Sequence, residues 1–286
     1  MRYALQIALL QAFLGAASLL VGPVQAETLE AHQPIHWEVP FKLYAGYLVV
    51  VEGRIGPLGG LKFVLDTGAT YSVVSREIVD KLRLPLSRGK VIAVNKTVMT
   101  EWAVLPNLDV AAIHVPGMPV LVDELSYFQP STTHVDAVIG LDLLRRQSFG
   151  INFRRKTVTF GPIEEESSGV PMKSDAVCLT VEVRIEDRTV PVIVDTGIRG
   201  LLLYEDRMRQ RAFRELTAFS IGGLLQSKLA TLKVRLGPTD IDPRVLLVPA
   251  PADGVLSGID GFFGVSSLHA RRVDFDFEHG VLRWKK

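Results

Sequence analysis

Two short runs of sequence place an aspartate directly after an apolar segment that is typical of a buried strand. Residues 63–74 read FVLDTGATYSVV, with Asp66 after the apolar residues, and residues 192–204 read VIVDTGIRGLLLY, with Asp195 in the same place. A carboxylate at the end of a buried strand is costly unless something pairs with it. Because the pattern occurs twice, we expect the two carboxylates to pair with each other.

Such a pair can carry out general acid–base chemistry. Two like charges held side by side cannot both ionise easily, so the pair is expected to share one proton. One carboxylate then acts as a base on a water molecule, while the protonated one donates to a carbonyl oxygen, and the result is amide hydrolysis. Gly68 and Gly197 allow tight turns in which backbone N–H groups reach the carboxylates. The hydroxyl groups of Thr67, and of Thr196 in the second run, can tie the loops down.

The elements that must position these loops are repeated along the chain. Residues 135–160 align without a gap to residues 259–284, and each segment follows its own D-T-G run. The sequence therefore predicts two copies of one lobe. We expect a signal peptide over 1–26, an N-terminal segment over 27–39, one lobe over 40–162, a linker over 163–169 and a second lobe over 170–286. The charged, Gly-, Pro- and Ser-containing composition around the linker is typical of a connection between lobes.

Each lobe is predicted to be mainly β, with few short helices. YLVVVEGRIG followed by GLKFVLDTG is typical of a hairpin that enters the first loop, and CLTVEVRIE followed by RTVPVIVDTG is its counterpart. Ser75 is a plausible N-cap for a helix over REIVDKLRL. Short helices are also expected to begin at Gly140 and Gly264. The expected fold class is therefore all-β.

The sequence resembles aspartic proteases of the pepsin and retropepsin clan. The resemblance is carried by the two D-T-G loops and by two later apolar-apolar-Gly motifs, Val138–Gly140 and Phe262–Gly264. It implies a bilobal acid-protease fold with a cleft between pseudo-symmetric lobes, and a Gly motif that packs behind the loop of each lobe. It also implies that Asp66 and Asp195 are the catalytic dyad of an endopeptidase, with the two loop threonines interlocked beneath it.

Two features qualify this resemblance. Retropepsins follow D-T-G with Ala and pepsins follow it with Ser or Thr, whereas the second loop continues with Ile198 and Arg199. A cation beside the dyad would favour its ionised form. A catalytically weak or inactive peptide-binding or scaffolding protein of the cell envelope is therefore the alternative. Hairpins over 91–104 and 219–234 are candidates for flaps over the substrate, with tips at Asn95 and Lys96 and at Gly222 and Gly223; ordinary surface hairpins are the other interpretation.

The N-terminus is typical of an export signal. Arg2 precedes an apolar run, and PVQA offers a processing site that would leave Glu27 first. We expect an exported protein, periplasmic or secreted, with attachment to a membrane only if this segment stays uncleaved.

Composition narrows the remaining possibilities. The 286 residues carry a net charge of +1, which gives no reason to expect a nucleic-acid partner. Cys178 is the only cysteine, and its apolar setting favours a buried hydrophobic side chain over a nucleophile. His32 and His36 are a weak metal candidate because Pro34 separates them. Asp136 and Asp260 are expected to be structural. We expect a monomer that acts on peptides or proteins without a metal or other cofactor.

Overall fold

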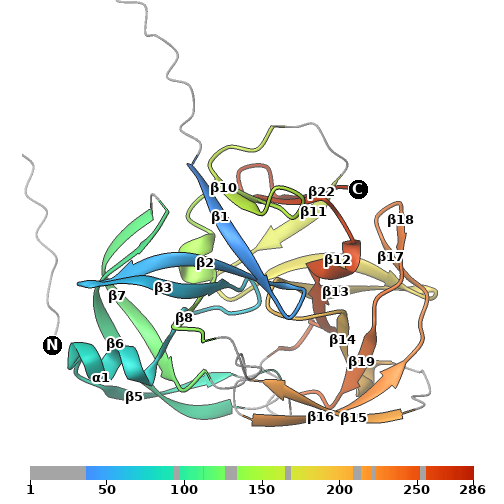
Figure 1. Ribbon diagram of the computed structural model, residues 1–286. Helices are drawn as coiled ribbons and strands as arrows, with labels where there is room; N and C mark the ends of the chain where they lie inside the picture. Colours follow the sequence, from blue (N-terminus) through green and yellow to red (C-terminus); the bar gives the residue numbers. More distant parts are fainter. Residues whose placement is uncertain are drawn as a thin grey trace, which may run out of the picture. The chain divides into compact units, whose positions relative to one another are not determined.

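The computed structural model is mostly β-strand, with short helical segments between the strands (Figure 1). This confirms the prediction of an all-β, aspartic-protease-like fold. No helix among the residues described is long and apolar enough to cross a membrane. The predicted signal peptide lies outside them, and the predicted lobe boundaries stay a prediction. The structure describes residues 37–92, 94, 97–111, 113–125, 134–164, 169–208, 214–220, 223–251 and 256–286.

The N-terminal lobe is a sheet in which the first D-T-G loop follows the buried end of β3 and precedes the buried strand β4. The β2–β3 hairpin leads into the first loop, and β3 then pairs in parallel with β8, which carries the first Gly motif. β4 lies between β8 and β7, and β6 returns to pair with β2. Valine-rich strands such as β2 suit this setting, since β-branched side chains pack well in sheets. The elements are β2 (Leu48–Ile55), β3 (Leu58–Leu65), β4 (Val73–Ser75), α1 (Arg76–Leu82), β5 (Ser87–Ile92), β6 (Thr97–Val110), β7 (Ile113–Asp123), β8 (Ala137–Ile139) and α2 (Leu141–Leu144).

The C-terminal lobe repeats this arrangement. The β12–β13 hairpin leads into the second loop, β13 pairs in parallel with β20, and β14 lies between β20 and β19. The helix α1 begins after Ser75, whose side chain accepts from the Ile78 N–H, whereas its counterpart is only a 3₁₀ turn, η2. The elements are β12 (Leu179–Ile185), β13 (Arg188–Asp195), β14 (Leu201–Tyr204), η2 (Glu205–Arg207), β15 (Arg214–Ser220), β16 (Gly223–Ala230), β17 (Val234–Leu236), β18 (Thr239–Ile241), β19 (Val245–Val248), β20 (Gly261–Gly264) and η3 (Val265–Leu268).

Six antiparallel strands form a sheet that the two lobes share. Their order is β1, β10, β9, β21, β22 and β11, and β1 and β11 also pair with β2 and β12 of the lobes. At its centre Gly150 lies opposite Asp274, which is the equivalent residue of the repeat. An approximate twofold axis therefore passes between β9 and β21. The strands are β1 (Trp37–Tyr44), β9 (Phe149–Asn152), β10 (Thr157–Phe160), β11 (Gly169–Ser174), β21 (Arg272–Asp276) and β22 (Val281–Lys285).

One hydrophobic core runs through both lobes and the shared sheet. It includes β-strand residues from each lobe and the aromatic residues of the shared sheet. Phe149 stacks on Phe275 with ring centroids 4.5 Å apart, and both side chains are fully buried. The lobes are thus joined by core packing as well as by strand pairing.

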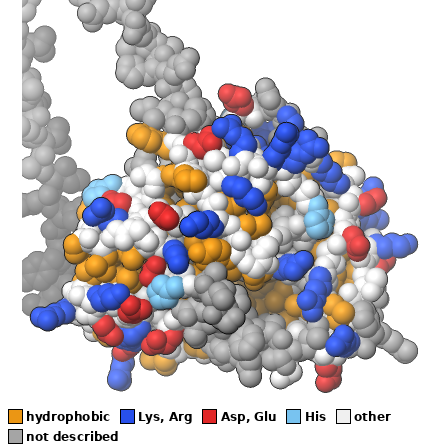
Figure 2. All heavy atoms as spheres, viewed as in Figure 1, with side chains coloured by type: hydrophobic (Ala, Val, Ile, Leu, Met, Phe, Trp, Pro, Cys, Tyr) orange, Lys and Arg blue, Asp and Glu red, His pale blue; other side chains and the backbone are white. Residues whose placement is uncertain are grey.

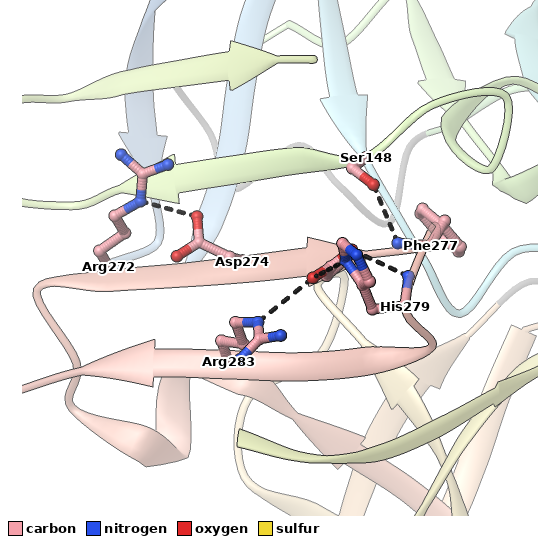
Figure 3. Close-up of polar contacts among 7 residues, drawn as sticks. Ser148, Arg272, Asp274, Phe277, His279 and Arg283 are labelled. Atoms are coloured by element: carbon pink, nitrogen blue, oxygen red, sulfur yellow. Dashed lines mark hydrogen bonds and ion pairs between the residues drawn. The ribbon is translucent and has the colours of Figure 1, made fainter. Parts of the chain in front are cut away.

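Polar contacts close one end of the shared sheet (Figure 3). Asp276 is completely buried and accepts from His279 Nδ1 at 2.9 Å and from Arg283 Nε at 3.2 Å. Burial alone would raise the pKa of Asp276, but the hydrogen bonds from His279 and Arg283 outweigh it and hold the pKa below its usual value. Ser148 Oγ accepts from the Phe277 N–H and so links β9 to the end of β21. The side chains in these contacts therefore have a structural role.

Candidate active site

The two D-T-G loops meet between the lobes through their threonines. Thr67 Oγ1 donates to the Val194 carbonyl at 2.8 Å, and Thr196 Oγ1 donates to the Leu65 carbonyl at 2.7 Å. Each hydroxyl also accepts the backbone N–H of the other threonine, at 3.0 and 3.2 Å. Both threonines are buried. Four reciprocal hydrogen bonds thus fix the position of one loop against the other, as the resemblance implied.

Asp66 and Asp195 are brought together above this interlock. The Gly68 N–H donates to Asp66 Oδ1 at 2.9 Å, and the Gly197 N–H donates to Asp195 Oδ1 at 2.6 Å. The two side chains also hydrogen-bond to each other. Each aspartate is therefore held by its own loop and faces its counterpart.

The loop glycines are needed because the opposite carboxylate lies against them. A Cβ on Gly68 would lie 2.3 Å from Asp195 Oδ2, and a Cβ on Gly197 would lie 2.5 Å from Asp66 Oδ2. Real Cβ atoms do not approach other atoms so closely, so any side chain here would displace the facing carboxylate. The glycines thus serve close approach across the interface as well as turn formation.

The environment disfavours double ionisation of the pair. Burial is the largest influence on both carboxyls and raises the pKa of each. The charge of Asp66 raises the pKa of Asp195 further, well above its usual value, although hydrogen bonds from the Gly197 and Ile198 N–H groups oppose the shift. The pair is therefore suited to share one proton between its two carboxyls.

The Gly motifs support the loops from behind. A Cβ on Gly140 would lie 2.8 Å from the Ala69 carbonyl oxygen, and a Cβ on Gly264 would lie 2.6 Å from the Ile198 carbonyl oxygen. The Gly264 N–H also donates to the Gly200 carbonyl at 2.7 Å. This is the packing that the resemblance implied.

A part-buried polar pair that sequence reasoning missed adds support in the first lobe only. Asp142 accepts from both the backbone N–H and the Oγ of Ser72, at 2.8 and 2.7 Å, and Ser72 Oγ accepts from the Gly140 N–H. In the second lobe the repeat places Leu201 and Ser266 at the positions of Ser72 and Asp142. The D-T-G spacing alone gives no signal for this asymmetry.

The proposed flap residues fall mainly outside the described residues. Asn95, Lys96 and Gly222 are among those outside, while Gly223 begins β16. Both hairpins form: β5 pairs with β6, and β15 pairs with β16. Their role as flaps stays a prediction.

The first hairpin reaches the second lobe. The fully buried Tyr204 donates from its hydroxyl to the Val94 carbonyl at 2.7 Å, and Val94 packs against the apolar cluster that contains Tyr204 and Phe262. Val94, which lies between β5 and β6, thus attaches this hairpin to the second lobe.

Aromatic residues near the dyad were also missed. Tyr47, in the β1–β2 turn, packs with Ala69 and Trp102 against a small apolar cluster of the first lobe. Its pKa is raised, first by burial and then by the charges of Asp195 and Asp66, so its hydroxyl lies near the dyad. Tyr71 makes an edge-to-face contact with Trp102 at 5.1 Å and is 44% exposed. These residues are candidates for contact with a substrate.

Arg199 does not hold the dyad in its ionised form. Its side chain is exposed, and burial, not the charge of Arg199, is the largest influence on the pKa of each aspartate, which it raises. Its charge does act on Tyr47, whose pKa it lowers in opposition to the burial effect. Arg199 therefore lies beside the site and does not prevent the dyad from sharing one proton.

The remaining candidates have structural surroundings. Cys178 is buried, and burial raises the pKa of its thiol to about 11, as expected of a hydrophobic side chain. Asp136 accepts the Lys62 N–H at 2.8 Å, and the backbone of Asp260 bonds to Pro191 and Tyr204. Within the described ranges, no group of three or more His, Cys, Asp or Glu side chains could hold a metal ion. His32 and His36 lie outside those ranges.

A comparison with known proteins gives a match to the N-terminal lobe. Residues 51–143 match the family model described as aspartyl protease, a segment that contains the first D-T-G loop and the first Gly motif. No curated protein matches the chain.

Proposed function

We propose that this chain, which carries a retropepsin-like aspartyl protease domain over residues 51–143, is an aspartic endopeptidase with Asp66 and Asp195 as its catalytic dyad. The observation that supports this most is the contact between two enclosed carboxyls of raised pKa, each held by a loop N–H. A binding module has no need of such a pair, which costs stability when it has no task.

The proposed reaction uses the shared proton. The ionised carboxyl removes a proton from a water molecule, and the water oxygen attacks the peptide carbonyl carbon. The protonated carboxyl donates to the carbonyl oxygen, so charge does not accumulate there. As the C–N bond of the tetrahedral intermediate breaks, the carboxyl that took the water proton gives it to the leaving nitrogen. The other carboxyl takes a proton from a hydroxyl of the intermediate, so the dyad again holds one proton. Since both carboxyls serve as acid or base, no covalent intermediate forms.

The geometry favours this reaction because the two D-T-G loops are already fixed in place before a substrate binds. The threonine hydrogen bonds hold the two carboxyls within contact of each other without substrate. Pre-positioned groups lower the entropic part of a barrier.

A pH profile of peptide hydrolysis tests the proposal. The purified chain is incubated with a broad peptide library from about pH 3 to about pH 8, and cleavage products are followed by mass spectrometry. We expect cleavage within chains, greatest under acidic to mildly acidic conditions, with a loss of rate as the shared proton leaves the dyad. A rate that rises with pH across this range would contradict the shared-proton mechanism.

We also propose that the protein is exported, on the basis of the apolar run and the PVQA site. Mass spectrometry of the protein from its native cells should find Glu27 at the N-terminus. A chain that retains Met1 and fractionates with membranes would instead indicate an uncleaved anchor.

A further inference from the structure

The two sides of the dyad differ in how the lobes meet. On one side, Thr70 Oγ1 of the first lobe donates to the Val177 carbonyl at 2.6 Å, in the β11–β12 turn of the second lobe. Arg145 covers the same turn, donating to the carbonyls of Asp175 and Ala176 at 2.5 and 3.0 Å. Polar contacts between the lobes therefore occupy this side.

The approximate twofold axis places Arg199 on the opposite side. Thr70 lies four residues after Asp66, and Arg199 lies four residues after Asp195. The partner of Thr70 is the β11–β12 turn, so the partner position of Arg199 is the β1–β2 turn. His269, not an arginine, occupies the position of Arg145 in the repeat.

Strand register identifies the residue of the β1–β2 turn that is equivalent to Val177. In the first lobe, Val50 pairs with Val64, two residues before Asp66, and Tyr47 lies three residues before Val50. In the second lobe, Thr180 pairs with Ile193, two residues before Asp195, and Val177 lies three residues before Thr180. Tyr47 is therefore the equivalent of Val177.

Electrostatics agrees with this placement. The charge of Arg199 acts on the Tyr47 hydroxyl, and so do the charges of both aspartates. Arg199 is exposed, and within the described part of the chain it has no hydrogen bond or ion pair. A cation and a phenolic O–H, both hydrogen-bond donors, thus lie together beside the dyad, and the cation has no acceptor among the residues that the structure describes.

We propose that Arg199 and Tyr47 form a carboxylate-binding subsite that selects peptide substrates with Asp or Glu near the cleaved bond. A guanidinium group matches a carboxylate in charge and geometry, and the tyrosine hydroxyl supplies a further donor. The proposal rests on the proposed function, since it assigns the substrate class of the same site. The resemblance to the clan does not imply it, because that resemblance rests on the D-T-G loops and the Gly motifs and assigns no role to position 199.

The test compares matched peptides that differ only in Glu or Gln, placed in turn at each position on either side of the cleaved bond. For wild type, kcat/KM at one position should favour Glu by about fivefold, as expected for an exposed charged pair. In Arg199→Gln this ratio should fall to about one, and in Tyr47→Phe it should be intermediate. In Arg199→Glu the same position should favour Lys over Gln. The exposed Arg235→Gln is the matched control and should keep the wild-type ratio.

Two results would overturn the subsite: no Glu preference at any position in wild type, or a preference that persists in Arg199→Gln. A binding measurement separates this from failure of the proposed function. Dissociation constants of the same Glu and Gln peptides for Asp195→Asn report the subsite without hydrolysis. If no peptide is cleaved but the Glu peptide binds more tightly, and the difference disappears on adding Arg199→Gln, the proposed function fails and the subsite stands. Equal affinities for the two peptides would reject the subsite.

Discussion

The side chains at the dyad show which interactions a short motif specifies and which it does not. D-T-G fixes a carboxylate, a hydroxyl and a glycine at one strand end, and the structure uses all three in each lobe. Tyr47 and the Ser72–Asp142 pair were not predictable from the sequence. Their contacts join residues far apart in the chain, so they depend on how the strands are placed and leave no local pattern.

Replacing Asp195 by a neutral residue should stabilise the fold near neutral pH. Its pKa is raised in the folded protein, so folded chains bind more protons than unfolded ones and stability falls as pH rises above the ordinary aspartate pKa. Asp195→Asn should raise the melting temperature at neutral pH by about 3 °C or more, and by less in acid. Calorimetry at several pH values measures this, with the exposed Asp187→Asn as control. A lower melting temperature than wild type at neutral pH would show that ionised Asp195 is not a cost to the fold.

Replacing Thr67 by valine tests the interlock. Valine has nearly the same shape, but it leaves the Val194 carbonyl and the Thr196 N–H without their partner. Each unsatisfied buried group costs about 1–3 kcal/mol, so the free energy of unfolding should fall by roughly 2–6 kcal/mol in denaturant titrations. The exposed Thr189→Val should change it by less than about 0.5 kcal/mol. Equal effects of the two variants would mean that the interlock adds no stability.

At the scale of elements, the sequence predicted what depends on local patterns. The hairpins that enter both loops, the helix after Ser75 and the helical turns after Gly140 and Gly264 all form where expected. Alternation of apolar residues, an N-cap and glycine positions carry that information within a few residues. The attachment of the β5–β6 hairpin to Tyr204 was not predicted, because it joins residues of different lobes.

The packing of the Gly motif behind the loop can be tested with one methyl group. Gly140→Ala would place Cβ 2.8 Å from the Ala69 carbonyl oxygen and from the Tyr71 carbonyl carbon, which are backbone atoms that cannot rotate away. Such overpacking should lower the free energy of unfolding by about 1–3 kcal/mol and should lower kcat by displacing the loop. Gly59→Ala, whose Cβ would meet only the flexible Arg54 side chain at 3.4 Å, is the control. If both variants behave like wild type, the loop does not rest on this glycine.

For the whole molecule, the repeat in the sequence predicted two similar lobes but not what joins them. The sheet shared by β1, β10, β9, β21, β22 and β11 uses strands from both ends of the chain, and pairing between distant strands has no single-sequence signature.

The charged side chains are distributed unevenly over the surface. On the face in Figure 2, acidic and basic side chains are interspersed, with Lys and Arg more frequent toward β10, β11 and β22.

The shared core predicts that the lobes unfold together. Phe275→Ala removes a buried ring that stacks on Phe149 at the centre of the shared sheet, which should cost about 3–5 kcal/mol. Because one core includes both lobes, hydrogen exchange should show equal loss of protection in β3 and in β13. Loss confined to one of these strands would indicate lobes that unfold independently.

The central claim is that two carboxyls, one from each lobe, act as one catalytic unit. The most direct measurement is peptide hydrolysis by Asp66→Asn and by Asp195→Asn, each verified as folded, beside wild type on the same cleaved peptide at its optimal pH. Because the two carboxyls act as acid and base in the same reaction, the loss of either one should remove nearly all activity. Each variant should therefore have a kcat/KM at least about a thousandfold below that of wild type. Hydrolysis at the wild-type rate by either variant would contradict the assignment of the dyad.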